Sequence, residues 1–202
     1  MADQPSPNPD LEPLTRIQVL LAIGVTAIVL LLMATLWRKF GAVALLPWKF
    51  QIRALLVGLG VGLLITAASS LIYRFWPAYR QSADYYLQLV LKPLLWPDLL
   101  WLGLLPGLSE ELLFRGVMLP AFGLGFMALA VSSISFGVLH LSSLQQWPYM
   151  AWAILVGFLL GYSAMATGNL LVPILAHILT NLLSSIIWKW NHQNNRGDFS
   201  TI

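Results

Sequence analysis

Only five acidic, basic or imidazole side chains interrupt the ninety-residue apolar stretch between Leu99 and Trp188. They are Glu110, Glu111, Arg115, His140 and His177. A charge near the centre of a bilayer costs several kcal/mol, so such residues normally face a protein interior or a water-filled cavity and mark a functional site. We therefore expect the functional site of the chain to lie in this stretch.

The composition places the chain in a membrane. Of its 202 residues, 58% are hydrophobic and only 9% are charged, against about 25% charged in soluble domains. The net charge is +3, and the basic residues form no continuous run. This distribution disfavours nucleic acid as a partner and favours membrane lipid. The absence of cysteine excludes disulfides, thiolate metal sites and a cysteine nucleophile.

The apolar segments predict an all-α fold, a polytopic transmembrane helix bundle of about six spans plus an interfacial helix. A segment with Arg80, Asp84 and Lys92 among its apolar residues is too polar to cross and is expected to lie at the interface. The predicted spans cover residues 17–37, 54–73, 98–119, 121–141, 148–166 and 171–190, and the interfacial helix covers 77–97.

The chain is expected to have four parts. Residues 1–16, rich in Pro and Asp, predict a disordered N-terminal tail, and residues 17–97 hold the first helices and the interfacial helix. Residues 98–190 form a helical core that carries the polar motifs, and residues 191–202 form a C-terminal tail. Very short joints predict that the last three spans are antiparallel neighbours.

Two further features concern packing and orientation. Gly58, Gly60 and Gly62 offer a small-residue strip where another helix can approach closely. The loop from Arg38 to Arg53 carries four positive and no negative charges. The positive-inside rule therefore places this loop in the cytoplasm.

The glutamate pair has two different helical settings. Glu111 and Arg115 are four residues apart and share a face, so a structural salt bridge explains that pair. Glu110 projects about 100° away and has no cation at helical spacing. An unpaired carboxylate in this setting is strongly perturbed unless it serves a water, a proton or a metal.

Two other spans supply the remaining polar groups. Phe136 lies four residues before His140, so its ring can pack beside the imidazole, and His177 shares a helix face with Asn181. Taken singly, such residues often only join helices. Together, Glu110 with a neutral imidazole can hold a water and take its proton, while a second His and an amide can donate to an oxyanion.

Zinc is a competing use of the same residues. Glu110, His140 and His177 would make a site of two His and one carboxylate with an open position, although the sequence lacks the H-E-x-x-H pattern. Serine chemistry is disfavoured because Ser109 and Ser135 lie in no G-x-S-x-G setting.

The three ordered motifs resemble those of the CPBP family of intramembrane proteases, which includes Rce1-type CAAX prenyl endopeptidases and bacteriocin-processing proteins. The family pattern is E-E-x-x-x-R, F-x-x-x-H and H-x-x-x-N, and the resemblance covers about residues 99–185. Residues 98–190 would then be the catalytic core of that family. The matching positions are Glu110, Glu111, Arg115, Phe136, His140, His177 and Asn181.

The resemblance implies a role for each of these residues. Glu110 and His140 would activate a water, His177 and Asn181 would form the oxyanion site, and Glu111 and Arg115 would support the geometry. The substrate would be a peptide or protein in or at the membrane. The family is often labelled metalloprotease, but its residues fit a metal-free glutamate mechanism equally well, and we favour the mechanism that requires no cofactor.

Two other classes of function use the same residues. A non-catalytic membrane scaffold or immunity protein would keep them for packing, and a carrier would use Glu110 and the histidines as a proton relay. Six spans without a visible repeat disfavour the carrier. The scaffold is the main alternative, and it differs from the protease in tolerating Gln at position 110.

Overall fold

The structure is a computed structural model that describes residues 14–197, and within this range it contains helices and no strand. The helices are α1 (Arg16–Phe40), α2 (Ile52–Phe75), α3 (Pro77–Leu91), α4 (Asp98–Glu111), the π-helix η1 (Leu112–Met118), α5 (Leu119–Ala121), α6 (Phe126–Val138), the 3₁₀ turn η2 (Leu144–Gln146), α7 (Trp147–Thr167) and α8 (Leu171–Gly197). The all-α prediction is confirmed.

Four helical segments in the described range are long and apolar enough to cross a membrane. They are Arg16–Phe40, Ile52–Phe75, Leu144–Thr167 and Leu171–His192. In addition, α4, η1 and α5 follow one another without a break from residue 98 to 121, which is about 36 Å of helix and matches the hydrocarbon thickness. The protein is therefore an integral membrane protein with several spans.

The predicted fourth span differs from the structure. Residues 121–141 were expected to cross, but α6 has only 13 residues, or about 20 Å of helix. Gly123 and Leu124 both adopt positive φ, so the chain turns before α6 begins. His140 follows the last turn of this short helix rather than lying inside a long span.

The chain ends also differ from the expected segments. Thr15 caps α1 by accepting a hydrogen bond from Gln18, so the helix begins at Arg16, within the predicted tail, whose residues 1–13 lie outside the described range. At the other end α8 continues past Trp190 to Gly197, into the predicted C-terminal tail. Residues 198–202 of that tail lie outside the described range.

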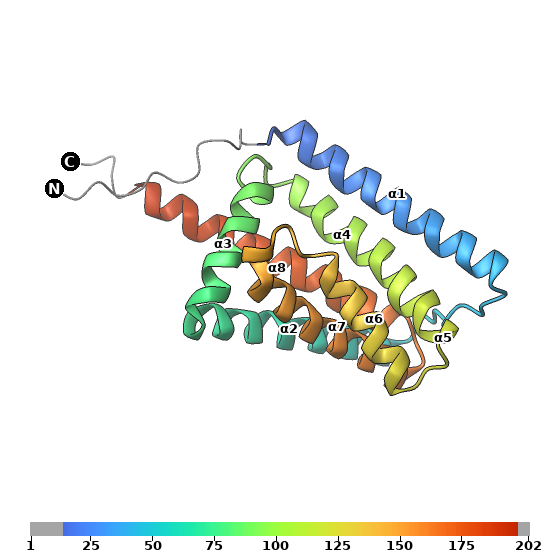
Figure 1. The fold of residues 1–202 in the computed structure, drawn as a ribbon. Coiled ribbons are helices and arrows are strands. Elements are labelled where there is room, and N and C mark those ends of the chain that lie inside the picture. Colours follow the sequence, from blue (N-terminus) through green and yellow to red (C-terminus); the bar gives the residue numbers. More distant parts are fainter. Residues whose placement is uncertain (1–13, 198–202) are drawn as a thin grey trace.

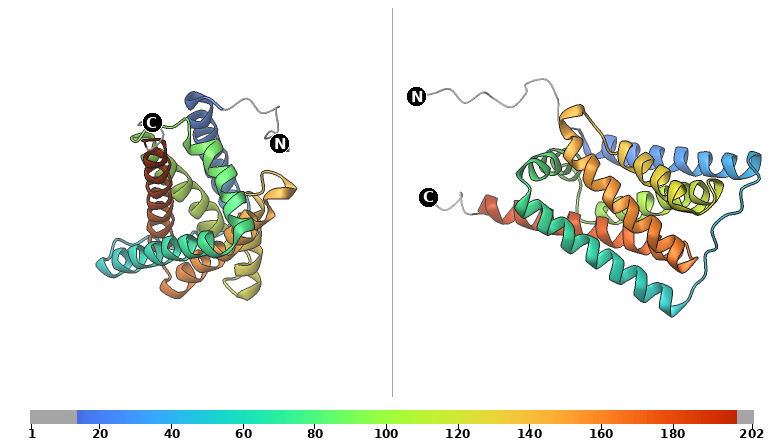
Figure 2. Two further views of the ribbon diagram at one scale, coloured as in Figure 1. Left: turned by 90° about the vertical axis from the view of Figure 1, so that its left-hand side faces the viewer. Right: turned by 60° about the horizontal axis from the view of Figure 1, so that its bottom comes forward.

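The helices pack around α8, which contacts both α2 and α4 extensively, while α1 packs on α4. Figure 1 shows α1, α4 and α8 running along the long axis of the molecule, with α3 crossing them steeply near one end. Figure 2 shows α2 and α7 beside α8 in both views. As expected from the short joints, α6 packs along α7 and α7 along α8.

Two of the three predicted small residues permit the contact between α2 and α8. A Cβ atom at Gly58 would lie 3.0 Å from the Val172 carbonyl oxygen, and one at Gly62 would lie 2.9 Å from the Ala176 carbonyl oxygen. Gly60 faces open space, so the prediction that it belongs to the strip was wrong. The close approach brings α8, with His177, against the interior face of α2.

Candidate active site

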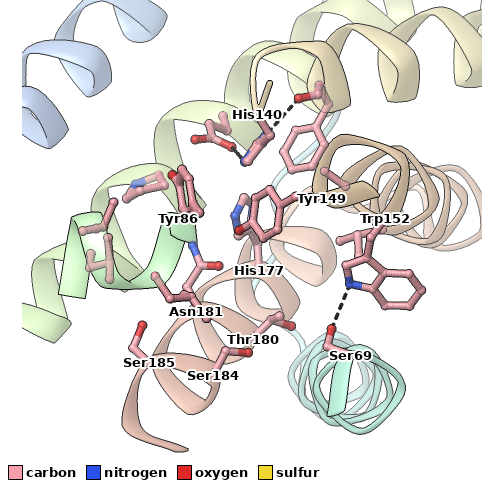
Figure 3. Close-up of a pocket in the computed structure, with 18 of the residues that line it drawn as sticks. Ser69, Tyr86, His140, Tyr149, Trp152, His177, Thr180, Asn181, Ser184 and Ser185 are labelled. Carbon is pink, nitrogen blue, oxygen red and sulfur yellow. Dashed lines mark hydrogen bonds and ion pairs between the residues drawn. The ribbon is translucent and has the colours of Figure 1, made fainter. Parts of the chain in front are cut away.

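All four residues predicted to be catalytic line one cavity of about 170 Å³. Glu110 reaches it from α4, His140 from the turn after α6, and His177 and Asn181 from α8. Figure 3 shows the labelled His140, His177 and Asn181 side chains directed toward the same space. The fold therefore brings together residues that are up to 71 positions apart in the sequence.

Glu110 and His140 face each other across a short gap. The distance from His140 Nε2 to Glu110 Oε2 is 4.0 Å, and the side chains are 19% and 15% exposed. His140 Nδ1 lies 2.8 Å from the Phe136 carbonyl oxygen, which can only accept, so Nδ1 is the donor. In the neutral ring, Nε2 is then an acceptor aimed at a carboxylate.

The gap suits a water molecule because both facing groups are hydrogen-bond acceptors. Glu110 Oε2 is buried without a hydrogen-bond partner among the described residues. A direct hydrogen bond across 4.0 Å is too long, whereas one water can donate to both atoms. The gap between the carboxylate and the imidazole is therefore of a size that one bridging water would fill.

The Phe136 ring packs against both histidine rings. Its ring centroid lies 4.7 Å from that of His140 and 5.7 Å from that of His177. The Arg115 guanidinium carbon lies 4.4 Å from the same ring centroid. The predicted packing of Phe136 beside His140 is therefore present, and the ring also joins the two histidines to the buried arginine.

Glu111 and Arg115 lie behind the cavity and are fully buried. Arg115 Nη1 donates to Glu111 Oε1 over 2.8 Å, and both side chains are 0% exposed. Arg115 Nη2 also donates to the Gly157 carbonyl oxygen on α7 over 3.0 Å. The predicted salt bridge is present, and it ties the glutamate helix to α7.

His177 also binds Glu111, which the sequence did not reveal. Its Nδ1 lies 2.8 Å from Glu111 Oε1, the same oxygen that accepts from Arg115. The carboxylate makes Nδ1 the donor, so Nε2 donates only when the ring is an imidazolium. Glu111 therefore fixes the orientation of the His177 ring.

A π-helix supplies the local geometry of the arginine. Leu119 N donates to the Phe114 carbonyl oxygen, five residues earlier, and the Gly116 carbonyl oxygen accepts from Leu46 N over 3.0 Å. A π-helix has more residues per turn than an α-helix and occurs frequently at functional sites. In this π-helix Arg115 reaches back to bind Glu111. Glu110, one residue before Glu111, lines the cavity.

The geometry bears on the two alternative chemistries. Ser109 donates to the Leu105 carbonyl oxygen over 2.7 Å and is buried, so this hydroxyl is used within its own helix. Among the described residues, no three His, Asp or Glu side chains lie where they could share a metal ion. Glu110, His140 and His177 do not form such a group in this geometry.

Sequence reasoning missed several residues of the cavity. Tyr86 on α3, Tyr149 and Trp152 on α7, and Ser69 on α2 all line it, and Trp152 Nε1 donates to Ser69 Oγ over 3.0 Å. None belongs to a motif. The one available signal was the helical pattern of α3, which places Tyr79, Tyr86 and Val90 on one side of that helix.

Comparisons with known proteins agree with the motif resemblance. The chain is 26% identical over 146 residues to the uncharacterized protein YpbD of Bacillus subtilis (strain 168), covering 72% of this chain and 75% of that protein. No solved structure matches it. Residues 92–183 match the model of the type II CAAX prenyl endopeptidase Rce1-like family, a membrane endopeptidase family. The part of the helical core that carries the polar motifs is therefore similar to the Rce1-like family.

Proposed function

We propose that the protein is an intramembrane endopeptidase that hydrolyses peptide bonds of membrane-associated substrates, with Glu110 and His140 activating the water. The observation that carries the proposal is the 4.0 Å gap between two facing acceptors. A scaffold would gain nothing from a buried carboxylate oxygen without a partner, because such a group costs stability.

The reaction follows from the positions of these acceptors. The water donates one proton to Glu110 as its oxygen attacks the carbonyl carbon of the substrate, and His140 Nε2 orients the second O–H bond. The tetrahedral oxyanion then collapses, and the C–N bond breaks. Protonated Glu110 returns its proton to the leaving nitrogen, so the carboxylate is regenerated.

His177 and Asn181 are the proposed donors to the oxyanion. Both line the cavity on α8, and the imidazolium form of His177 is the form that can donate through Nε2 while Nδ1 binds Glu111. Fixed donors aimed at developing negative charge give a large part of enzymatic acceleration. Glu111 and Arg115 hold this ring without touching the substrate.

Replacing Glu110 by Gln tests the base. The change keeps size and hydrogen bonding but removes proton-accepting power, so it should lower the rate at least about 10²-fold with an unchanged melting temperature. The assay uses purified protein in detergent and two quenched fluorescent probes, a farnesylated CAAX peptide and an unprenylated transmembrane peptide. Asp84→Asn is the matched control, because Asp84 on α3 binds Tyr73 and does not line the cavity.

Two further measurements separate the mechanisms. His140→Ala should resemble Glu110→Gln, and the double variant should be little slower than either, because residues that act as a unit are non-additive. Full activity of Glu110→Gln would remove the glutamate mechanism. Loss of wild-type activity on chelation, restored by Zn²⁺, would instead assign the same residues to a metal site, and no cleavage by the wild type would favour the scaffold.

A further inference from the structure

Two tyrosines from different helices meet at the cavity wall beside the proposed catalytic groups. The ring centroids of Tyr86 on α3 and Tyr149 on α7 are 4.8 Å apart and the rings are stacked. The Tyr149 centroid is 6.3 Å from that of His140. Figure 3 shows Tyr86 and Tyr149 grouped with His140, His177 and Asn181, away from the hydroxyls of Ser184 and Ser185.

The hydroxyl groups of this pair are not used by the protein. Within the described part of the chain, neither Tyr86 nor Tyr149 makes a side-chain hydrogen bond, whereas Tyr73 donates to Asp84 over 2.7 Å. Both residues are partly exposed and line the cavity, so their hydroxyls can bind a group that enters it. Burial raises the pKa of Tyr86 to about 12, with a smaller contribution from Glu110, so its hydroxyl stays protonated and can donate.

Packing explains the rings but not the hydroxyls. Tyr79 stacks on Tyr149 with centroids 6.2 Å apart, and Trp76 lies 5.9 Å from Trp147 at the same end of α7. Phenylalanine would serve such an aromatic layer equally well. A hydroxyl on a residue that lines the cavity therefore needs a second explanation.

The arrangement of donors and acceptors suggests that explanation. Glu110 and His140 Nε2 present acceptors to the cavity, so they attract a water rather than a carbonyl oxygen. The two phenols are donors on a neighbouring wall. A peptide chain between them would place its carbonyl oxygens on the phenols and one carbonyl carbon near the water.

We propose that Tyr86 and Tyr149 are substrate-positioning residues whose hydroxyls donate hydrogen bonds to backbone carbonyl oxygens of a peptide next to the bond that is cut. The proposal rests on the endopeptidase function proposed above. It gives α3 a part in substrate binding, although α3 precedes the family match at residues 92–183. Positioning of this kind contributes to the rate by holding the reacting atoms close together.

The test removes each hydroxyl and keeps each ring. Tyr86→Phe and Tyr149→Phe should each raise KM for the faster-cleaved of the two probes about threefold to tenfold, the effect of one neutral hydrogen bond, with a smaller change in kcat and an unchanged melting temperature. Matched controls on the same helices are Tyr85→Phe and Tyr162→Phe, whose side chains are exposed. Both controls should leave KM unchanged.

A second probe series identifies the acceptor. Each amide within three residues of the cleaved bond is replaced in turn by an alkene, which keeps the shape and removes the carbonyl oxygen. One of these replacements should raise KM for the wild type but change KM little for Tyr86→Phe. Combining the probe change with the protein change forms a thermodynamic cycle, which isolates the contact between the two altered groups.

The outcomes separate the two proposals. Wild-type cleavage with KM unchanged in both Phe variants would overturn the positioning role and leave the endopeptidase function intact. A raised KM accompanied by an equal loss of thermal stability would assign the hydroxyls to folding and also overturn it. Absence of cleavage of either probe by the wild type would overturn both proposals.

Discussion

Two neighbouring glutamates in this chain have opposite surroundings, and the difference defines their roles. Glu111 is fully buried, and one of its oxygens accepts from both Arg115 and His177. Glu110 is partly exposed in the cavity and faces His140 across a gap. The first carboxylate is held by partners within the protein, and the second has an oxygen that no partner among the described residues occupies.

The first prediction at this scale concerns Arg115. Arg115→Ala leaves the Glu111 carboxylate buried without its main counter-charge, which typically costs about 3–5 kcal/mol. We expect a large fall in melting temperature in detergent, measured by intrinsic tryptophan fluorescence. The exposed Arg53 provides the control, because Arg53→Ala should change the melting temperature little. An unchanged melting temperature in Arg115→Ala would show that the ion pair contributes no net stability.

Residue-level prediction succeeded where contacts are local and failed where they depend on the fold. The pairing of Glu111 with Arg115 follows from a spacing of four residues, and the structure confirms it. The bond between His177 and Glu111 joins residues 66 positions apart, so helix periodicity contains no information about it. The same holds for Tyr86 and Tyr149, which meet only because α3 crosses near the start of α7.

At the scale of elements, the contact between α6 and α7 positions the histidine. Gly137 lies on α6 between Phe136 and His140, and a Cβ atom there would be 2.9 Å from Ile154 N and 3.1 Å from Ile154 Cα on α7. Backbone atoms cannot move aside as a flexible side chain can. The two helices therefore approach at a distance that only glycine permits.

Gly137→Ala should separate α6 from α7 and move His140 away from Glu110. We expect a loss of stability of about 1–3 kcal/mol, as for other overpacked cores, together with a lower rate of probe cleavage. The control is Gly24→Ala in α1, where an added Cβ would meet nothing within 4 Å. Equal melting temperatures and rates for both variants would contradict the close contact.

Element boundaries were the least predictable feature of the fold. The apolar run at 121–141 matched a full span, yet the positive φ values of Gly123 and Leu124 shorten the helix to Phe126–Val138. Hydropathy reports whether residues favour lipid or protein interior and does not report where the backbone turns. The end of α8 was missed for the related reason that polar residues after Trp190 can continue a helix outside the membrane.

At the scale of the whole molecule, the loops and turns that connect the helices lie at two opposite ends. The start of α1, α3 and the end of α8 lie near one end, and the turn between α5 and α6 lies near the other (Figure 1). The loop that joins α1 to α2 also lies at the second end, where Lys49 N and O bind the Asn169 side chain between α7 and α8. The basic loop and the α7–α8 turn therefore share one membrane side.

Cysteine labelling tests the orientation. The positive-inside rule predicts that Ala42 faces the cytoplasm, and the structure puts Ser143, between α6 and α7, at the opposite end. In intact cells an impermeant thiol reagent should label Ser143→Cys and spare Ala42→Cys until the membrane is permeabilised. The unmodified chain has no cysteine, so the parent protein is the blank. The reverse labelling pattern would invert the topology.

The π-helix between the glutamates and the rest of their helix has a consequence for insertions and deletions. A π-helix differs from an α-helix by extra residues in the same length of coil. Removing one residue from Leu112–Met118 would let the segment continue as an ordinary α-helix, with the helix unbroken. Each residue turns an α-helix by about 100°, so the two carboxylates would rotate out of phase with Gly116, whose carbonyl oxygen is anchored by Leu46. The direction in which Glu110 points is thus encoded by the number of residues in this segment, and not by their identity alone.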